Sequence, residues 1–229
     1  METNFLIKYM NDRVMHFTKK MIDPGPVITI SRECGCSGGA FAEKLTESIN
    51  KKITDPAKNW KWVSKEILNL ASKELKINPD QIKSLLNLEE KTLLDKMVFS
   101  FADKYYVNDA KIRIVIQEVI RNIAIRGNAV IVGRGSEALT LDIPRSLHVR
   151  LFAPLSWKTA VISERGNISH EEAKKIVIQV DKQRAKFRDA YLHKNKDIIA
   201  NDIEFNCAKF SQEEMVSVIL NIAELKSLI

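Results

Sequence analysis

Four arginines in this sequence occupy positions at which a guanidinium group could bind phosphate: Arg32, Arg134, Arg184 and Arg188. A guanidinium donates two parallel hydrogen bonds to one anion, which suits phosphate esters. Arg32 ends one apolar run, and Arg134 stands between two glycines directly after another. A Gly-Arg-Gly turn at the end of a buried strand is an unusual place for a charge without a ligand, so we expect Arg134 to belong to a binding site.

Arg184 and Arg188 lie one helical turn apart, in a segment of helical periodicity, on the same face as Asp181. Such a face could close over a bound phosphate. It could also be a solvated helix surface on which Asp181 pairs with the two arginines. The sequence leaves both interpretations open.

A glycine-rich loop follows the first apolar run and is a second candidate for phosphate binding. Its residues are Cys34, Gly35, Cys36, Ser37, Gly38 and Gly39. A loop between a strand and the positive N-terminus of a helix can turn its backbone N–H groups toward an anion. The lysine-bearing pattern G-x-x-x-x-G-K-[ST] is missing, because glycines stand where the lysine is expected. A glycine-rich turn without a ligand is therefore the alternative.

The two cysteines of this loop allow further interpretations. A thiol beside a helix N-terminus can have a lowered pKa and become reactive. A zinc site would need two more ligands, and no Cys/His pair stands nearby in the sequence. We favour the simpler interpretation, in which small side chains fill a tight loop.

Alternating strand and helix patterns position these residues. An apolar run predicts a strand at residues 27–32, and further strands are predicted at residues 60–63, 129–132, 146–153 and 203–208. Helical periodicity and caps predict helices at residues 38–50, 65–75, 78–86, 109–126, 155–165, 170–192 and from 211 onward. Such alternation favours a parallel sheet with helices on both faces. Loops 31–39 and 133–135 should then lie side by side at the carboxyl edge, where these sheets bind ligands.

Composition and charge restrict the classes of function. The formal net charge of +7 favours an anionic partner, but the lysines are scattered and no basic stretch interleaves with aromatic residues. We therefore expect localised phosphate sites and no nucleic-acid binding. No apolar run approaches the ~20 residues that span a bilayer, and charges interrupt the N-terminus, which excludes a membrane span and a signal peptide. Three cysteines make no disulfide framework, so we expect a cytoplasmic protein.

Taken together, the motifs resemble the cytidylate kinase-like family, a divergent branch of the P-loop nucleoside monophosphate kinases. The matching segments are residues 27–42, which contain the glycine loop, a second motif at 130–135, the strand before the lid at 148–155 and the helix with the lid arginines at 169–188. The resemblance covers about residues 27 to 225. It implies a three-layer α/β fold of the P-loop NTPase type, with a five-stranded parallel sheet, helices on both faces and a helical substrate lobe.

The expected domain organisation follows from this resemblance. Residues 27–229 would form the kinase-like domain, with a mobile substrate lobe at about 60–108 and a lid region at about 155–200. Residues 1–26 predict a peripheral amphipathic helix, which packs on the domain or on a second copy of the chain. A homo-oligomer is thus compatible with the sequence.

The resemblance implies ATP-dependent phosphoryl transfer to cytidylate or a related monophosphate, with ATP and Mg²⁺. The glycine loop would hold the ATP phosphates, and Arg134 and Asp181 would bind the acceptor. Arg32, Arg184 and Arg188 would act electrostatically on the transferring group.

Three departures from the family pattern leave an alternative open. The P-loop lysine and the following Ser/Thr, which ligates Mg²⁺, are absent, and Gly135 replaces the aspartate of the second motif. Charge neutralisation would then rest on the arginines, with Glu33 or Asp181 as candidate metal partners. A non-catalytic nucleotide- or phosphate-binding protein on the same fold is the alternative function. The sequence does not determine the acceptor base, the metal ligands or the oligomeric state.

Overall fold

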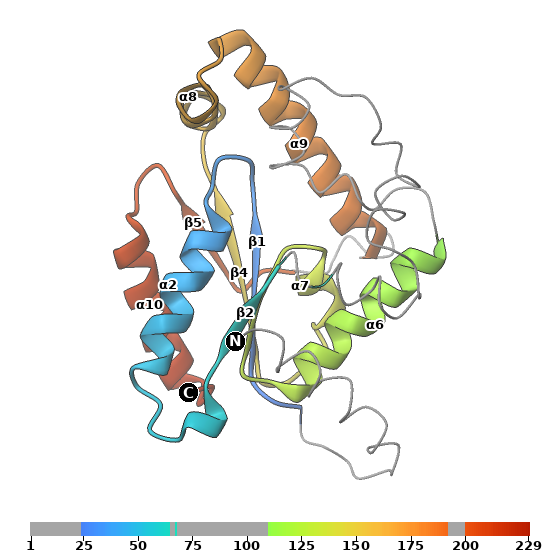
Figure 1. The fold of residues 1–229 in the computed structure, drawn as a ribbon, viewed down its shortest axis with the longest axis vertical. Coiled ribbons are helices and arrows are strands. Elements are labelled where there is room, and N and C mark those ends of the chain that lie inside the picture. The colour runs from blue at the N-terminus through green and yellow to red at the C-terminus, as the bar shows by residue number, and fades with distance from the viewer. Residues whose placement is uncertain (1–23, 65–66, 68–109, 192–199) are drawn as a thin grey trace.

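A five-stranded parallel sheet forms the centre of the computed structural model, which describes residues 24–64, 67, 110–191 and 200–229 (Figure 1). The strands are β1 (Val27–Arg32), β2 (Lys61–Val63), β3 (Ala129–Val132), β4 (Ser146–Phe152) and β5 (Ile203–Asn206). Their order across the sheet is β2-β3-β1-β4-β5, and each neighbouring pair is parallel. The predicted α/β fold with five parallel strands is confirmed.

The register of the central strand β1 decides which loops meet at the carboxyl edge. Ile30 of β1 is paired with Val132 of β3. The next residue continues the pattern, because the Gly133 N–H donates to the Ile30 carbonyl over 2.9 Å. The Gly133 turn therefore begins beside Ser31 near the end of β1, and loops 31–39 and 133–135 lie side by side, as the sequence predicted.

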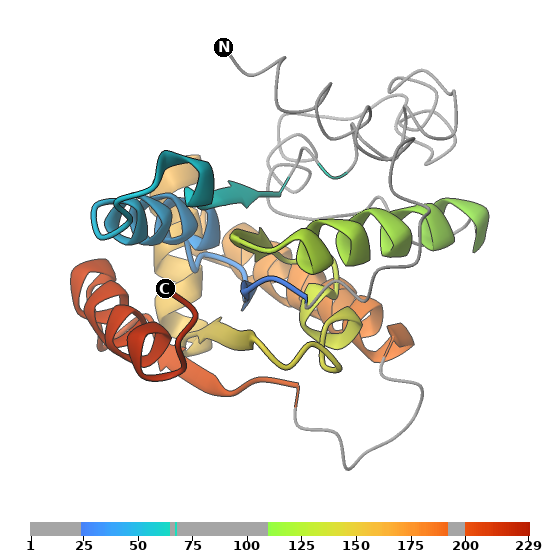
Figure 2. The ribbon, with the colours of Figure 1, turned by 90° about the horizontal axis from the view of Figure 1, so that it is seen from below.

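Helices cover both faces of the sheet (Figure 2). They are α2 (Gly38–Asn50), α6 (Ala110–Arg126), α7 (Ser136–Leu139), α8 (Leu155–Gly166), α9 (His170–Tyr191) and α10 (Gln212–Leu225), with a 3-10 helix η1 (Pro56–Lys58). Helices α2 and α10 pack on one face of the sheet and α6 on the other. Helices α8 and α9 lie beyond the carboxyl edge (Figure 1), where they form a small apolar cluster of their own.

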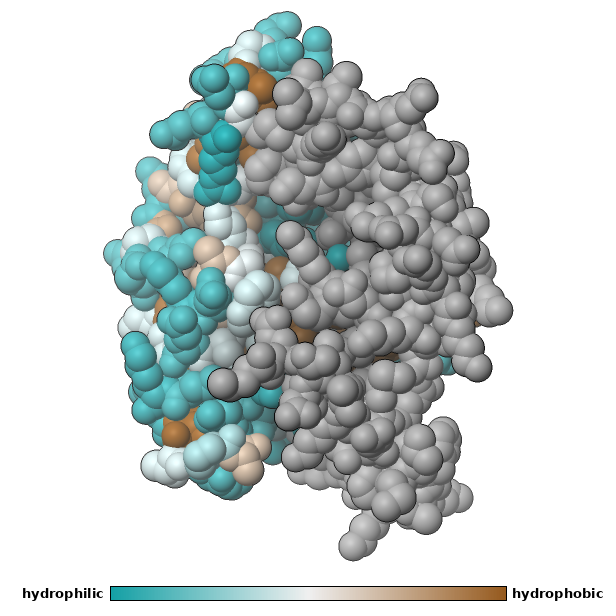
Figure 3. All heavy atoms as spheres, viewed as in Figure 1, coloured by the Kyte–Doolittle hydropathy of each residue, from teal (hydrophilic) through white to brown (hydrophobic). Residues whose placement is uncertain are grey.

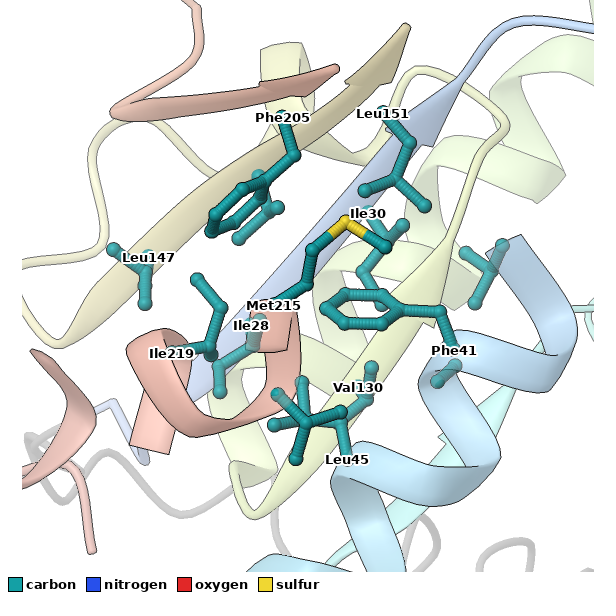
Figure 4. Packing of buried hydrophobic residues seen from close by; sticks show 14 of the residues in the cluster. Ile28, Ile30, Phe41, Leu45, Val130, Leu147, Leu151, Phe205, Met215 and Ile219 are labelled. Atoms are coloured by element: carbon teal, nitrogen blue, oxygen red, sulfur yellow. The ribbon is translucent and has the colours of Figure 1, made fainter. Parts of the chain in front are cut away.

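Alternate side chains of the strands enter two separate hydrophobic cores. Ile28 and Ile30 of β1 face α2 and α10, where Phe41 and Ile219 pack near them (Figure 4). Val27 belongs to the core under α6 instead. Because both faces of the strand are buried, apolar residues occur at Val27, Ile28 and Ile30 without strict alternation.

Side-chain caps determine where two helices begin. At α10, the Ser211 Oγ accepts from the Glu214 N–H at 3.2 Å, and the Glu214 carboxylate accepts from the Ser211 N–H at 2.8 Å. Ser169 and Glu172 make the same reciprocal pair before α9. Both capping boxes were read from the sequence, and both are confirmed.

The sequence missed two short elements, η1 and α7, because neither is long enough to show a period. Several predictions fall on residues that the structure does not describe. These are the helix at 1–26, the helices at 65–75 and 78–86, most of the substrate lobe at 60–108 and the part of the lid region at 192–199. They stay predictions.

The part of the described surface that is visible in Figure 3 is mostly hydrophilic. The large exposed hydrophobic side chains of the described residues are distributed over four helices and one loop rather than gathered in one patch. Within the described part of the chain, no helix is long and apolar enough to cross a membrane.

Candidate functional site

A pocket of about 340 Å³ at the carboxyl edge of the sheet is lined by arginines from four segments of the chain. Its arginines are Arg32, Arg134, Arg150, Arg184 and Arg188. Its wall also contains the carboxylates of Glu33, Glu137 and Asp181. All four arginines predicted from the sequence are thus brought together with Asp181. The fifth, Arg150 of β4, was not predicted.

Two glycines make room for the side chain of Arg32, which runs from the first loop to the second. A Cβ placed on Gly38 would lie 3.1 Å from the Arg32 Cγ, and one on Gly133 only 1.8 Å from its Nη1. Gly133 also has a φ of +76°, which L-residues rarely adopt. A side chain at Gly133 would therefore strain the backbone and displace the Arg32 guanidinium, whereas one at Gly38 would only make a tight contact with Arg32.

Arg134 follows β3 in a left-handed conformation, with a φ of +63° and only 4% of its surface exposed. Its Nε donates to the Ser64 carbonyl over 3.1 Å, which joins the ends of two neighbouring strands. The contact with Ser64 is structural, whereas the position of Arg134 in the pocket wall would allow it to bind a ligand. The predicted role of Arg134 in binding the acceptor stays a prediction.

Hydrogen bonds fix two more arginines of the pocket. Arg150 Nη2 donates to Glu33 Oε1 over 2.9 Å. Arg184 Nη1 reaches from α9 to the Arg32 carbonyl at 3.2 Å. The helix face that carries Arg184 therefore packs onto the end of β1, and the purely solvated interpretation of this face is wrong for Arg184.

A buried ammonium lies between the glycine loop and helices α8 and α9. Lys158 Nζ is 2.7 Å from Glu33 Oε2 and 2.6 Å from Asp181 Oδ2, and 9% of its side chain is exposed. Burial disfavours the charge of Lys158, but its hydrogen bonds with Asp181 and Glu33 outweigh burial and raise its pKa. Burial opposes the charge of Glu33 as well, yet its bonds with Lys158 and Arg150 lower its pKa. Lys158 and Glu33 are therefore both charged at neutral pH.

The thiols of the glycine loop are packed into hydrophobic cores. Cys34 is fully buried in the cluster that α8 and α9 form, and burial raises its pKa to about 11. Cys36 lies in the main core, where its hydrogen bond with Cys207, followed by burial, raises its pKa. The suggestion of reactive loop thiols is wrong, and the space-filling interpretation is confirmed. These two positions can meet a ligand only through their backbone.

The backbone of the loop already binds an anionic group. The Cys34 N–H donates to Asp181 Oδ1 over 2.7 Å. The Ser37 hydroxyl, at the other end of the loop, accepts from Arg165 Nη2 over 2.8 Å. Two further N–H groups bond to carbonyls within the loop. The Cys34 N–H is thus the loop donor that binds an anionic group here, and the predicted role of the loop toward the ATP phosphates stays a prediction.

A sequence profile of the cytidylate kinase-like family matches residues 27–204, which contain the loop and every arginine of the pocket. The chain belongs to this family. A comparison with proteins of curated function gave no match.

One solved structure supports the fold. An uncharacterised protein from Eubacterium ventriosum ATCC 27560 aligns with a TM-score of 0.61 and 23% identity, over 87% of this chain and 98% of that one. A shikimate kinase from Bacteroides thetaiotaomicron aligns with a TM-score of 0.48 and 12% identity, over 87% and 97% of the two chains. One from Acinetobacter baumannii, in complex with shikimate, has the same TM-score and 11% identity, over 91% and 98%. The first likeness supports the fold, and the other two are too distant to support more.

Within the site of this family member, two buried oxygen atoms have no hydrogen-bond partner among the described residues. They are Glu137 Oε2 and Gln183 Oε1, and both residues line the arginine pocket. Glu137 is 2% exposed, and burial raises its pKa despite the nearby Arg188 and Arg32. Buried polar atoms are nearly always bonded, so a ligand with hydroxyl or amino donors would suit these two acceptors.

The described residues contain no group of three or more His, Cys, Asp or Glu that could hold a metal ion. Mg²⁺ in phosphoryl-transfer sites is commonly bound by one or two carboxylates together with substrate phosphates. Glu33 and Asp181 have the right chemistry, but both are bonded to Lys158. Mg²⁺ bound here would therefore need ligands from the substrate phosphates, and Glu33 or Asp181 would have to give up its bond to Lys158 to bind the metal.

Sequence reasoning missed Arg150, Lys158, Arg165 and Glu137. A signal existed for Arg150, which is a charge inside an otherwise apolar strand. None existed for Lys158 and Arg165, because a basic residue on an amphipathic helix is usually solvent-exposed. Glu137 follows the Gly-Arg-Gly turn, but nothing local shows that it is buried.

Proposed function

We propose that this protein transfers the γ-phosphoryl group of ATP to a nucleoside monophosphate, with a cytidylate-like acceptor. The observation that carries the proposal is the pocket with five arginines beside a glycine loop, in a member of the cytidylate kinase-like family. Phosphoryl transfer needs positioning and neutralisation of spread negative charge rather than covalent chemistry, and guanidinium groups supply both.

Each group has a distinct role in this proposal. The glycine loop and the N-terminus of α2 bind the phosphates of ATP, which supplies the group to be transferred. Arg134 binds the phosphate of the acceptor from the neighbouring loop. Arg32, Arg184 and Arg188 stabilise the charge that develops between the two. Mg²⁺ would neutralise further phosphate charge, with Glu33 and Asp181 as the carboxylates at hand.

A non-catalytic phosphate-binding protein is the second candidate. It is favoured by the missing loop lysine and by the ion pairs that hold Lys158. Such a protein would bind the same nucleotides in the same pocket without transferring the phosphoryl group. Binding and turnover must therefore be measured separately.

The decisive experiment is a coupled assay of ATP turnover with each nucleoside monophosphate and Mg²⁺, together with calorimetric titration of the same ligands. Turnover with a preferred monophosphate supports the kinase. Saturable binding without turnover supports the second candidate, and absence of both overturns the shared site.

Variants of Arg134 test the acceptor site. A charge-assisted contact to phosphate is worth roughly 1.5–3 kcal/mol, so Arg134→Ala should weaken monophosphate binding by about one to two orders of magnitude. Arg134→Lys should recover part of it, because an ammonium lacks the planar fork. Arg145→Ala is the matched control, since Arg145 also bonds a backbone carbonyl, that of Ser227, outside the pocket. Equal affinities in the Arg134→Ala and control variants would remove Arg134 from the site.

A further inference from the structure

Lys158 is an unusual lysine, because it is buried beside a loop that lacks one. It lies on the first turn of α8, where its Cα would be 3.6 Å from a Cβ placed on Gly35. Its ammonium nitrogen lies between Glu33 and Asp181, at 2.7 and 2.6 Å. Helix α8 thus brings a cation against the loop from outside the loop's own sequence.

Asp181 bridges this cation to the backbone of the loop. One carboxylate oxygen accepts from Lys158 Nζ, and the other accepts from the Cys34 N–H over 2.7 Å. A loop N–H and a lysine ammonium are the two kinds of donor with which phosphate-binding loops hold a phosphate. In this structure, a carboxylate takes both of them.

We infer that Lys158 supplies the phosphate-binding ammonium that the glycine loop lacks, and that Asp181 competes with a phosphate for Lys158 and the Cys34 N–H. The inference rests on the proposed function, because it assigns a residue to the triphosphate half of that site. It gives Asp181 a role different from the one expected from the family resemblance, in which Asp181 binds the acceptor.

The two carboxylates around Lys158 are not equivalent, and this makes the exchange possible. Glu33 is fixed by three donors, which are Lys158, Arg150 and the Ala153 N–H. Asp181 is held by the two donors that a phosphate would use. When a phosphate replaces Asp181, Lys158 keeps its bond to Glu33 and stays beside the loop. A buried ammonium is costly without a partner, and at every stage here it has one.

The sign of one affinity change separates this inference from its alternatives. Asp181→Asn keeps the shape and an acceptor for the Cys34 N–H, but it removes the charge that competes with phosphate. Affinity for ATP and for inorganic tripolyphosphate, measured calorimetrically without an acceptor, should rise by roughly five- to twentyfold, within the range of a charged hydrogen bond. If Asp181 binds the acceptor instead, triphosphate affinity stays unchanged and monophosphate affinity falls.

Lys158 is tested by two variants, because the simple deletion leaves Glu33 and Asp181 without their cation. Lys158→Met should lower tripolyphosphate affinity by about tenfold or more, and Lys158→Arg should recover part of it. The double variant Lys158→Met/Asp181→Asn removes one charge of each sign and is the version expected to fold. It should bind tripolyphosphate as weakly as Lys158→Met.

Asp142→Asn is the matched control for charge. Asp142 is an ion-paired carboxylate that bonds Arg121 outside the pocket, so its change alters the net charge equally. Unchanged tripolyphosphate affinity in both Asp181→Asn and the Lys158 double variant overturns the inference, even if the wild type transfers phosphoryl groups. Tighter binding in Asp181→Asn, together with no turnover by the wild-type protein on any monophosphate, keeps the inference and overturns the kinase.

Discussion

Gly133→Ala is the substitution whose cost can best be worked out from the structure. The added Cβ would lie 1.8 Å from the Arg32 Nη1, and contacts under 3.0 Å are essentially absent for real Cβ atoms. The guanidinium must therefore move by more than about 1 Å. In addition, the φ of +76° places an L-residue in the left-handed region, which costs about 1–2 kcal/mol.

These two penalties predict a measurable loss of stability. The free energy of unfolding should fall by about 1–3 kcal/mol. In a chain of this size, each kcal/mol lowers the melting temperature by roughly 2–4 °C. Denaturant unfolding monitored by circular dichroism measures the free energy, and calorimetry measures the melting temperature.

A double-mutant cycle separates the clash from the backbone strain. In an Arg32→Ala background the clash is absent, so Gly133→Ala should cost only the strain of its φ. The coupling energy between the two sites should be at least about 0.5 kcal/mol. Gly39→Ala is the control, because its Cβ would be 3.9 Å from the Trp62 ring, an ordinary contact, and a helical alanine is favourable there. An equal cost of Gly133→Ala in both backgrounds would refute the packing argument for Arg32.

Three further predictions follow from burial and caps. Burial raises the pKa of Glu137 above its ordinary value of 4.5, so the folded state holds the Glu137 proton to higher pH than the unfolded state does. The protein therefore loses stability as the pH rises from the unfolded pKa of Glu137 through its folded pKa. Glu137→Gln should therefore stabilise the protein more at pH 7 than at pH 4 in denaturant titrations, and an equal gain at both pH values contradicts this. Ser211→Ala should cost about 1 kcal/mol of unfolding free energy through loss of its cap; a cost below about 0.3 kcal/mol would show that the cap is dispensable. The hydrogen bond with Cys36 lowers the pKa of Cys207, so Cys207 should react before the buried Cys34 in native alkylation at pH 8, followed by mass spectrometry. Faster labelling of Cys34 would show that the α8–α9 cluster opens.

Much of the fold could be predicted because its signals are local. Strands buried on both faces are rich in apolar residues, so β1 (Val27–Arg32) and β3 (Ala129–Val132) were predicted with their observed bounds. Helix α2 (Gly38–Asn50) was also predicted with its observed bounds. Capping boxes fix helix starts through residues three positions apart, as at Ser169 and Ser211.

The candidate site could be predicted only in part. The carboxyl edge was predicted because parallel strands end together, and this rule brought Arg32 and Arg134 into one pocket. The reason for a glycine at position 133 was not predicted. From the sequence, a glycine that is needed for a positive φ cannot be told apart from one that leaves room for a neighbouring side chain. Gly133 needs both, and only the path of the Arg32 side chain shows the second requirement.

The sequence by itself determined the strands, the helices and the edge at which they present their loops, because each depends on residues close together in the chain. Only the tertiary structure decided which side chains meet there. Lys158 and Glu33 are 125 positions apart, and Cys34 and Asp181 are 147 apart. No periodicity relates such pairs, so a lysine that looks like a surface residue of α8 becomes a buried cation beside the glycine loop once α8 and α9 pack against the sheet edge.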